Sequence, residues 1–216
     1  RADATTFHDI PGSPIAYWAS KAVHKAFLQG LRLNKIATLK QGMKTADNQR
    51  FLRLWFEPSF LLTGCQSVNK ADCYDGSPWV PYLKGGDFRK WFGNFDYVLY
   101  WKNNGEELKG FSRAVLRNIA YSFKPGISWS VVSSGRLALR ITPAGFMFDG
   151  AGSEIFGNKV PDEYIMAFLN SSIGTVFASI MSPTLMFEVG QLSNYPLVCS
   201  REALEPISQI VLSNIH

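Results

Sequence analysis

Residues 79–101 read WVPYLKGGDFRKWFGNFDYVLYW, and this stretch decides much of the fold. Nine of its 23 residues are aromatic, whereas 14% of the whole chain is aromatic. Short apolar runs bounded by turn signals are typical of buried strands, so the stretch predicts strands over 78–83 and 95–101. The turn between them contains a glycine pair and three basic residues: Lys84, Gly85, Gly86, Arg89 and Lys90.

The composition allows a folded domain with a polyanionic partner. The chain has 216 residues, of which 46% are hydrophobic and 18% are charged, so it can bury a sizeable core and is not disordered by composition. A net charge of +5 and a pI of about 9.1 suit nucleic-acid binding, although the basic residues are spread along the chain. The sequence has no run of about 18 apolar residues, which predicts no membrane span.

The cysteines favour a reduced environment. Cys65, Cys73 and Cys199 form no C-x-x-C pair and have no histidine pair nearby. This spacing is not that of zinc ligands or of a disulfide framework, so we expect no metal site and a cytoplasmic location. The chain starts at Arg1 without an initiator methionine or a signal peptide, which is typical of a piece of a longer polypeptide.

Outward from residues 79–101, the patterns predict further strands and helices. Toward the N-terminus we predict a helix over 13–28, capped by Ser13 and ended by Gly30, and then strands over 33–40 and 51–56. Toward the C-terminus we predict a helix over 105–121, and then hairpin strands over 127–134 and 137–142 around Ser134-Gly135. A strand over 145–150 and a loop over 151–161 follow. The last predicted elements are a helix over 163–181 capped by Asp162, a strand over 184–189 and a helix over 200–214.

These elements predict a mixed α/β (α+β) fold with a twisted, largely antiparallel sheet and flanking helices. The tryptophans are assigned to packing rather than to binding: Trp18, Trp55, Trp101 and Trp129.

Two catalytic motifs match the sequence literally, and neither has its expected context. Residues 148–152, FDGAG, fit the F-x-G-x-G loop that holds S-adenosylmethionine, but Gly157 and Pro161 break the helix that should follow. Asp96, Glu107 and Lys109 fit the D…E-x-K pattern of Mg²⁺-dependent nucleases, but the last two lie in a predicted helix rather than a strand. We therefore expect no catalytic residues in this chain.

Three segments together resemble the C-terminal target-recognition region of large adenine-specific DNA methyltransferases. They are GMKTADNQRFLRLW (42–55), WVPYLKGGDFRKWFGN with FDYVLYWKNNGEELK (79–109), and GISWSVVSSGRLALRITPAGFMFDGAGSEIF (126–156). The resemblance is to BREX-type phage-defence methyltransferases and to fused type II restriction–modification enzymes. The closing segments YIMAFLNSS (164–172) and SPTLMFEVGQLSNYPL (182–197) are also similar to type I specificity subunits.

The resemblance implies a DNA-reading part without catalytic residues. In the family, the methyltransferase domain with its S-adenosylmethionine loop and its Asn-Pro-Pro-Tyr motif lies N-terminal to this region, and this chain lacks both. We expect a linker helix over 1–32, a target-recognition domain over 33–199 and a C-terminal helix over 200–216. The implied partners are double-stranded DNA, the missing methyltransferase domain, which would hold the cofactor, and other defence-system subunits.

Such a domain needs basic and amide side chains on loops that strands hold in place. Three polar turns between the predicted strands fit this role. The candidate DNA-binding residues are Lys44, Thr45, Asn48 and Arg50 in the first turn, Lys84, Gly85, Gly86, Arg89 and Lys90 in the second, and Ser133, Ser134 and Arg136 in the third. Two alternatives remain open: a nuclease that uses Asp96, Glu107 and Lys109, and a module that docks other defence subunits.

Overall fold

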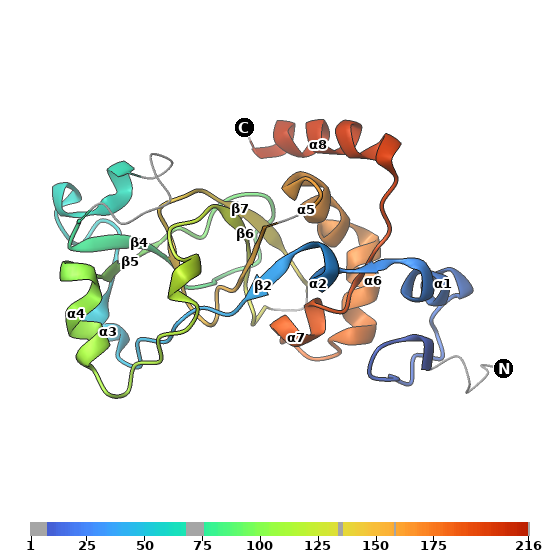
Figure 1. Cartoon of the computed structure of the whole chain (residues 1–216), viewed down its shortest axis with the longest axis horizontal. Coiled ribbons are helices and arrows are strands. Elements are labelled where there is room, and N and C mark those ends of the chain that lie inside the picture. The colour runs from blue at the N-terminus through green and yellow to red at the C-terminus, as the bar shows by residue number, and fades with distance from the viewer. Residues whose placement is uncertain (1–7, 68–75, 134–135, 158, 216) are drawn as a thin grey trace.

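The structure is a computed structural model, which describes residues 8–67, 76–133, 136–157 and 159–215. Figure 1 shows an elongated molecule with a β-rich end, a helical end and the first sheet between them. The first sheet has the order β2-β9-β6-β7, with β2 (Thr38–Lys40), β9 (Glu154–Phe156), β6 (Gly126–Trp129) and β7 (Leu139–Thr142). The second sheet has the order β3-β5-β4-β8, with β3 (Leu52–Leu54), β5 (Tyr97–Tyr100), β4 (Trp79–Leu83) and β8 (Met147–Phe148).

Antiparallel pairing dominates, as the sequence predicts. Within the two larger sheets, the pair β4–β8 alone is parallel among the described residues. A small antiparallel pair joins β1 (Leu31–Arg32) to β10 (Pro196–Leu197) and so holds two segments far apart in the sequence side by side. The fold class, a mixed α/β structure with largely antiparallel sheets and flanking helices, is confirmed, although the strands divide between separate sheets.

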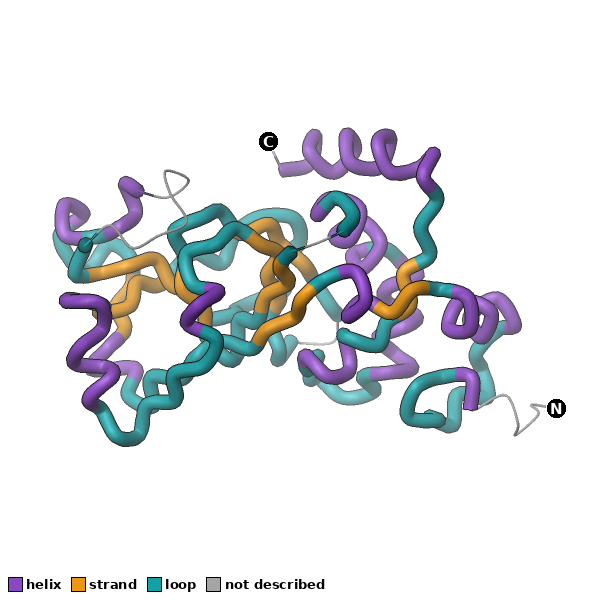
Figure 2. Tube along the Cα trace, viewed as in Figure 1, coloured by secondary structure: helices purple, strands orange, loops and turns teal. Residues whose placement is uncertain are grey.

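Helices cover both ends of the molecule, as Figure 2 shows in purple. α3 (Asn48–Phe51) and α4 (Lys102–Gly110) lie beside the second sheet. The other helices surround the first sheet and the chain termini: α1 (Lys21–Gln29), α2 (Leu33–Ile36), α5 (Asp162–Asn170), α6 (Ser172–Met181), α7 (Val189–Leu192) and α8 (Arg201–Ile215). Among the described residues no single helix is long and apolar enough to cross a membrane; α5 and α6 together meet the criteria of length and composition, but they are bent by 70°.

The first sheet has one apolar face and one polar face. Alternate residues such as Ile127, Leu139 and Ile155 are fully buried against the helices. The opposite face carries buried polar side chains, namely Ser128, Arg140, Thr142 and Glu154. This polar face is turned toward the second sheet, because Phe156 on the same face packs on Phe148 of β8 with ring centroids 5.5 Å apart.

The residues Leu169-Asn170-Ser171 connect α5, β7 and α6. Leu169 is buried in the core at the end of α5. Asn170 bonds the edge of β7, since its Oδ1 accepts from Leu139 N at 2.8 Å and its Nδ2 donates to Leu139 O at 3.0 Å. The Ser171 hydroxyl caps α6 by accepting from the amides of Ile173 and Gly174. The three residues thus end one helix, hold a strand and begin the next helix.

Several predicted elements are confirmed, namely the strands around residues 78–83 and 95–101, the strand within 51–56, the pairing of the hairpin strands, the short strand within 145–150 and the final helix. Ser134, Gly135 and Cys73 lie outside the described residues. Trp101 and Trp129 are fully buried as predicted, whereas Trp18 and Trp55 are about half exposed, so their assignment to packing is wrong.

The predicted N-terminal elements are partly wrong. The first helix begins at Lys21, where Ser20 caps it by accepting from Val23 N, and Ser13 instead has a positive φ of 47°. Gly30 ends it as predicted. The strand over 33–40 is divided, because the one-turn helix α2 precedes β2.

The later corrections share one cause, which is tertiary packing. The helix over 105–121 stops at Gly110, after which Phe111 turns to pack on Phe51. The predicted loop over 151–161 contains β9, a central strand of the first sheet. The helix over 163–181 is two helices and follows Pro161 rather than a cap at Asp162. The strand over 184–189 is reduced to a single bridge between Met186 and Val132, followed by α7.

Candidate nucleic-acid interface

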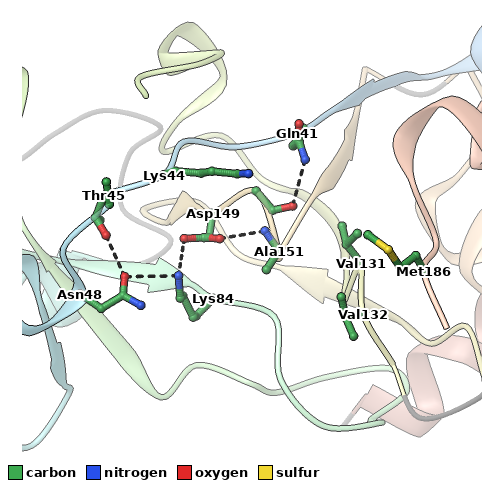
Figure 3. A pocket seen from close by; sticks show the side chains of 12 residues that line it. Gln41, Lys44, Thr45, Asn48, Lys84, Val131, Val132, Asp149, Ala151 and Met186 are labelled. Atoms are coloured by element: carbon green, nitrogen blue, oxygen red, sulfur yellow. Dashed lines mark hydrogen bonds and ion pairs between the residues drawn. The ribbon is translucent and has the colours of Figure 1, made fainter. Parts of the chain in front are cut away.

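An open pocket of about 460 Å³ lies where the chain passes between the two larger sheets. Residues 41–47 leave β2 for the second sheet, and residues 149–153 return from β8 to β9. Figure 3 shows the side chains of both crossings meeting the end of β4. The lining residues are Gln41, Lys44, Thr45, Ala46, Asn48, Lys84, Val131, Val132, Asp149, Gly150, Ala151 and Met186.

Glycines allow the three segments to touch through their backbones. A Cβ on Gly42 would lie 2.0 Å from the Phe148 carbonyl oxygen, and one on Gly152 would lie 2.7 Å from that of Leu83. Gly85 has a φ of +83°, and its Cβ would meet the Ala151 oxygen at 2.7 Å. Gly85, a candidate DNA-binding residue, therefore makes its close backbone approach to the chain itself.

An ion pair fixes the end of β4 over this frame. Lys84 Nζ lies 2.7 Å from Asp149 Oδ2, with side-chain exposures of 27% and 5%. The Tyr82 hydroxyl donates to the same oxygen at 2.9 Å, and Ala151 N donates to Oδ1 at 2.8 Å. Burial, and then the charge of Asp149, raises the pKa of Tyr82 well above its ordinary value. Tyr82 therefore stays neutral and holds the carboxylate that positions Lys84.

Asn48 joins the same group of side chains from the start of α3. Its Oδ1 accepts from the Thr45 hydroxyl at 2.8 Å and lies 3.5 Å from Lys84 Nζ. The turn before it is held by Asp47, whose carboxylate accepts from Arg50 N and caps α3. Thr45 is buried and Asn48 is exposed, so the hydroxyl positions the amide and the amide faces solvent.

Lys44 is the exposed cation of the pocket. Its backbone pairs with Val115 in both directions at 2.9 Å, so the start of its side chain is fixed. Its ammonium has no ion pair among the described residues, unlike that of Lys84. In Figure 3 the Lys44 side chain extends across the pocket above Asp149. An unpaired lysine on a fixed backbone is suited to a phosphate contact.

The glycine loop 148–152 does not present its amides to a ligand. The amides of Asp149 and Gly150 donate to the carbonyl oxygens of Leu83 and Met43, both at 2.8 Å. Those of Ala151 and Gly152 donate to the Asp149 side chain and carbonyl. The loop continues into a strand rather than a helix, so it lacks the free amides and the helix N-terminus that a phosphate-cradling loop uses.

The structure brings four predicted residues together, Lys44, Thr45, Asn48 and Lys84, and places the others elsewhere. Arg50 turns to α4, where Nη2 lies 2.8 Å from Glu107 Oε1.

The basic residues after the glycine pair extend away from the pocket. Lys90 Nζ donates to the Asn170 carbonyl oxygen at the end of α5. Arg89 is exposed, and its carbonyl accepts from the buried Arg140. The carbonyl of Gly86 accepts from the Ser130 hydroxyl at 2.9 Å.

The third predicted turn is near the pocket rather than in it. The Ser133 hydroxyl donates to the Arg136 carbonyl at 2.9 Å and is buried, whereas Arg136 is exposed. Ser134 is outside the described residues. It is the preceding pair, Val131 and Val132, that reaches the pocket wall.

The nuclease alternative finds no support in this arrangement. Glu107 and Lys109 lie on α4, where Glu107 is paired with Arg50 and Lys109 Nζ lies 5.3 Å from the Trp101 ring centroid. Asp96 precedes β5, and its carbonyl accepts from Trp55 N. No group of three His, Cys, Asp or Glu side chains within the described ranges is placed to hold a metal ion.

Sequence reasoning missed Asp149, Gln41 and the apolar wall of Val132 and Met186. In the sequence Asp149 stands within the glycine motif FDGAG, and an acid directly after an aromatic strand is the signal that could have indicated a partner for Lys84. Gln41 bridges the frame, since its Oε1 accepts from Arg117 at 3.0 Å and its carbonyl accepts from Asn118 at 2.8 Å. No signal in one sequence pairs residues so far apart.

No protein family model matches the chain. The chain is 40% identical over 206 residues to adenine-specific methyltransferase PglX of Lacticaseibacillus casei (strain Zhang). The aligned region covers 91% of this chain and 17% of that protein. It is 37% identical over 196 residues to adenine-specific methyltransferase BrxX of Escherichia coli O9:H4 (strain HS), covering 89% of this chain and 16% of that protein. The chain thus spans about one sixth of the length of these curated relatives. Over nine tenths of its own length, it is similar to one region of the BREX-type adenine-specific methyltransferases.

Proposed function

We propose that this chain is the DNA target-recognition region of an adenine-specific methyltransferase in a bacterial restriction–modification or BREX phage-defence system. One observation carries the proposal: Lys44 and Asn48 from one turn and Lys84 from another converge on one open pocket over a rigid backbone frame. Ammonium and amide groups are the side chains that contact phosphates and base edges in duplex DNA. The similarity to methyltransferases that act on adenine supports the same reading.

In the proposed enzyme this region recognises DNA, and a methyltransferase domain elsewhere in the polypeptide carries out the methylation. Residues 33–199 would read the duplex through the major groove. Residues 1–32 would connect this region to the methyltransferase domain, and residues 200–216 would form the C-terminal helix. S-adenosylmethionine would be held by the other domain, which would extrude the adenine and methylate it. Such a function belongs in the cytoplasm, where the DNA lies.

The pocket offers a charged contact for a phosphate and an apolar contact for a base or sugar. Lys44 is exposed and unpaired among the described residues, so it can neutralise a phosphate. Val132 and Met186, with exposures of 59% and 42%, form an apolar edge that suits a thymine methyl group or a sugar. A duplex lying over the pocket would therefore meet a charged edge, a polar centre and an apolar edge.

Duplex binding at a series of salt concentrations tests the proposal. We expect the affinity of the chain for duplex DNA to fall steeply with salt, and Lys44→Ala to weaken binding to all sequences and to reduce the log–log salt slope by about one. Lys21→Ala is the matched control, because Lys21 is an exposed lysine on α1, at the far end of the molecule in Figure 1. Absence of salt-sensitive binding at low ionic strength, or an equal effect of the two variants, would contradict the proposal.

A further inference from the structure

The amide of Asn48 has a fixed orientation. An ammonium group donates hydrogen bonds and accepts none, so the Asn48 atom 3.5 Å from Lys84 Nζ is the oxygen. The Thr45 hydroxyl donates to the same oxygen at 2.8 Å. Because Oδ1 already accepts two hydrogen bonds, the group that Asn48 offers to a ligand is its Nδ2 amide nitrogen, which donates hydrogen bonds.

Lys84 adds a second donor beside the first. Its ammonium has three protons, and the structure directs two of them, toward Asp149 Oδ2 at 2.7 Å and toward Asn48 Oδ1. The pair with Asp149 fixes the position of the ammonium, and a side chain exposed by 27% is still accessible to a ligand. Asn48 and Lys84 together present two neighbouring donors at the pocket, as Figure 3 shows.

Two adjacent donors match one base edge in the major groove. Guanine presents two acceptors there, N7 and O6, whereas adenine presents an acceptor and a donor and cytosine presents a donor. We infer that Asn48 and Lys84 read a guanine of the target sequence through its N7 and O6, with Thr45 as the residue that positions the Asn48 amide. The inference rests on the proposed function and names the base that this site recognises.

The arrangement also excludes the usual use of asparagine in DNA recognition. Asparagine reads adenine by accepting from N6 through Oδ1 while it donates to N7 through Nδ2. Here Oδ1 is held by Thr45 and lies against a cation, so accepting from an adenine N6 would require breaking one of these contacts. The pocket therefore disfavours adenine at the same base position where it favours guanine.

Selection and chemical substitution of DNA test the inference. The full chain is used to select bound duplexes from a randomised pool, and each guanine of the selected sequence is then replaced by 7-deazaguanine, which lacks the N7 acceptor but pairs normally. We expect the replacement to weaken binding about tenfold at one guanine position. In Asn48→Ala that position should lose both its base preference and its sensitivity to 7-deazaguanine, whereas all other positions keep theirs.

Two further variants separate recognition from folding. Gln49→Ala, at an exposed neighbour on the same short helix that does not line the pocket, should leave every position unchanged. Thr45→Val keeps the side-chain shape but frees the Asn48 amide, so it should relax the preference at the same guanine position and admit adenine there. Thermal unfolding of each variant checks that the fold is intact.

The possible outcomes are distinct. Complete absence of duplex binding by the wild-type chain at low salt would refute the proposed function, and the inference with it. Binding without sequence preference, a selected sequence without guanine, or an Asn48→Ala variant whose preferences are unchanged would refute the inference and leave the proposed function standing.

Discussion

Glu154 makes the stability of the fold depend on pH in an unusual direction. It lies in β9, between Lys40 of β2 and Ser128 of β6, with 1% of its surface exposed. Neither carboxyl oxygen has a hydrogen-bond partner in the described part of the chain, and it forms no ion pair with Lys40 or Arg140, the cations on its face of the sheet. Burial raises its pKa from 4.5 to about 8, and the neighbouring Thr142 hydroxyl offsets little of this rise.

The sign of the effect follows from the two pKa values. Between pH 4.5 and about 8 the folded chain keeps a proton on Glu154 that the unfolded chain releases, so raising the pH favours unfolding. Below 4.5 both states are protonated, and above about 8 both are ionised, so the difference is constant outside this window. Stability should fall by at most about 1.4 kcal/mol per pH unit inside the window, to a total of up to about 5 kcal/mol.

Urea unfolding of the wild type and Glu154→Gln at pH 5, 6, 7 and 8 measures this contribution. Glutamine keeps the size of the side chain and stays neutral, so the variant should gain stability relative to the wild type with each step in pH. Glu205→Gln is the control, because Glu205 is exposed on α8 and should show no such trend. If the difference between wild type and Glu154→Gln does not change with pH, the carboxyl group is not held neutral by burial and the reasoning is refuted.

Two further predictions concern stability. Asn170→Ala should cost about 1–3 kcal/mol, because the buried N–H of Leu139 loses its partner, whereas the C=O of Leu139 keeps its bond from Trp91 N; an equal loss in urea unfolding of the control Asn194→Ala, which removes one exposed hydrogen bond to the Gly190 carbonyl, would contradict this. Gly42→Ala should destabilise the chain by about 3 kcal/mol or more, since the new Cβ would lie 2.0 Å from the Phe148 oxygen, whereas Gly190→Ala, with nothing within 4 Å of its Cβ, should be near neutral in thermal unfolding.

The sequence predicts those parts of the fold that depend on local pattern. The strands β4 and β5 follow from aromatic and apolar runs around a glycine turn, and α8 follows from a periodic run after a polar segment. It fails at β9, because the three residues Glu154–Phe156 follow two glycines and contain a charged residue, both of which indicate a loop. Only the neighbours β2 and β6, more than 20 residues away along the chain, make this segment a strand.

The candidate site is predictable to a similar extent. The polar turns containing Lys44, Asn48 and Lys84 are visible as basic and amide residues between strands, and the structure brings them together. Arg50, Arg89 and Lys90 have the same local appearance but contact Glu107, solvent and the end of α5. Sequence shows which residues have suitable chemistry, whereas the sheet order decides which of them share a surface.

The backbone contacts at Gly42, Gly85 and Gly152 separate the scaffold of the pocket from its recognition code. The scaffold is held by main-chain atoms, which exposed rim side chains such as Lys44, Asn48 and Val132 do not alter. A library that varies these rim positions while keeping the glycines would therefore change which ligands are bound without rebuilding the fold. The same separation gives evolution a route to new specificities through a few substitutions.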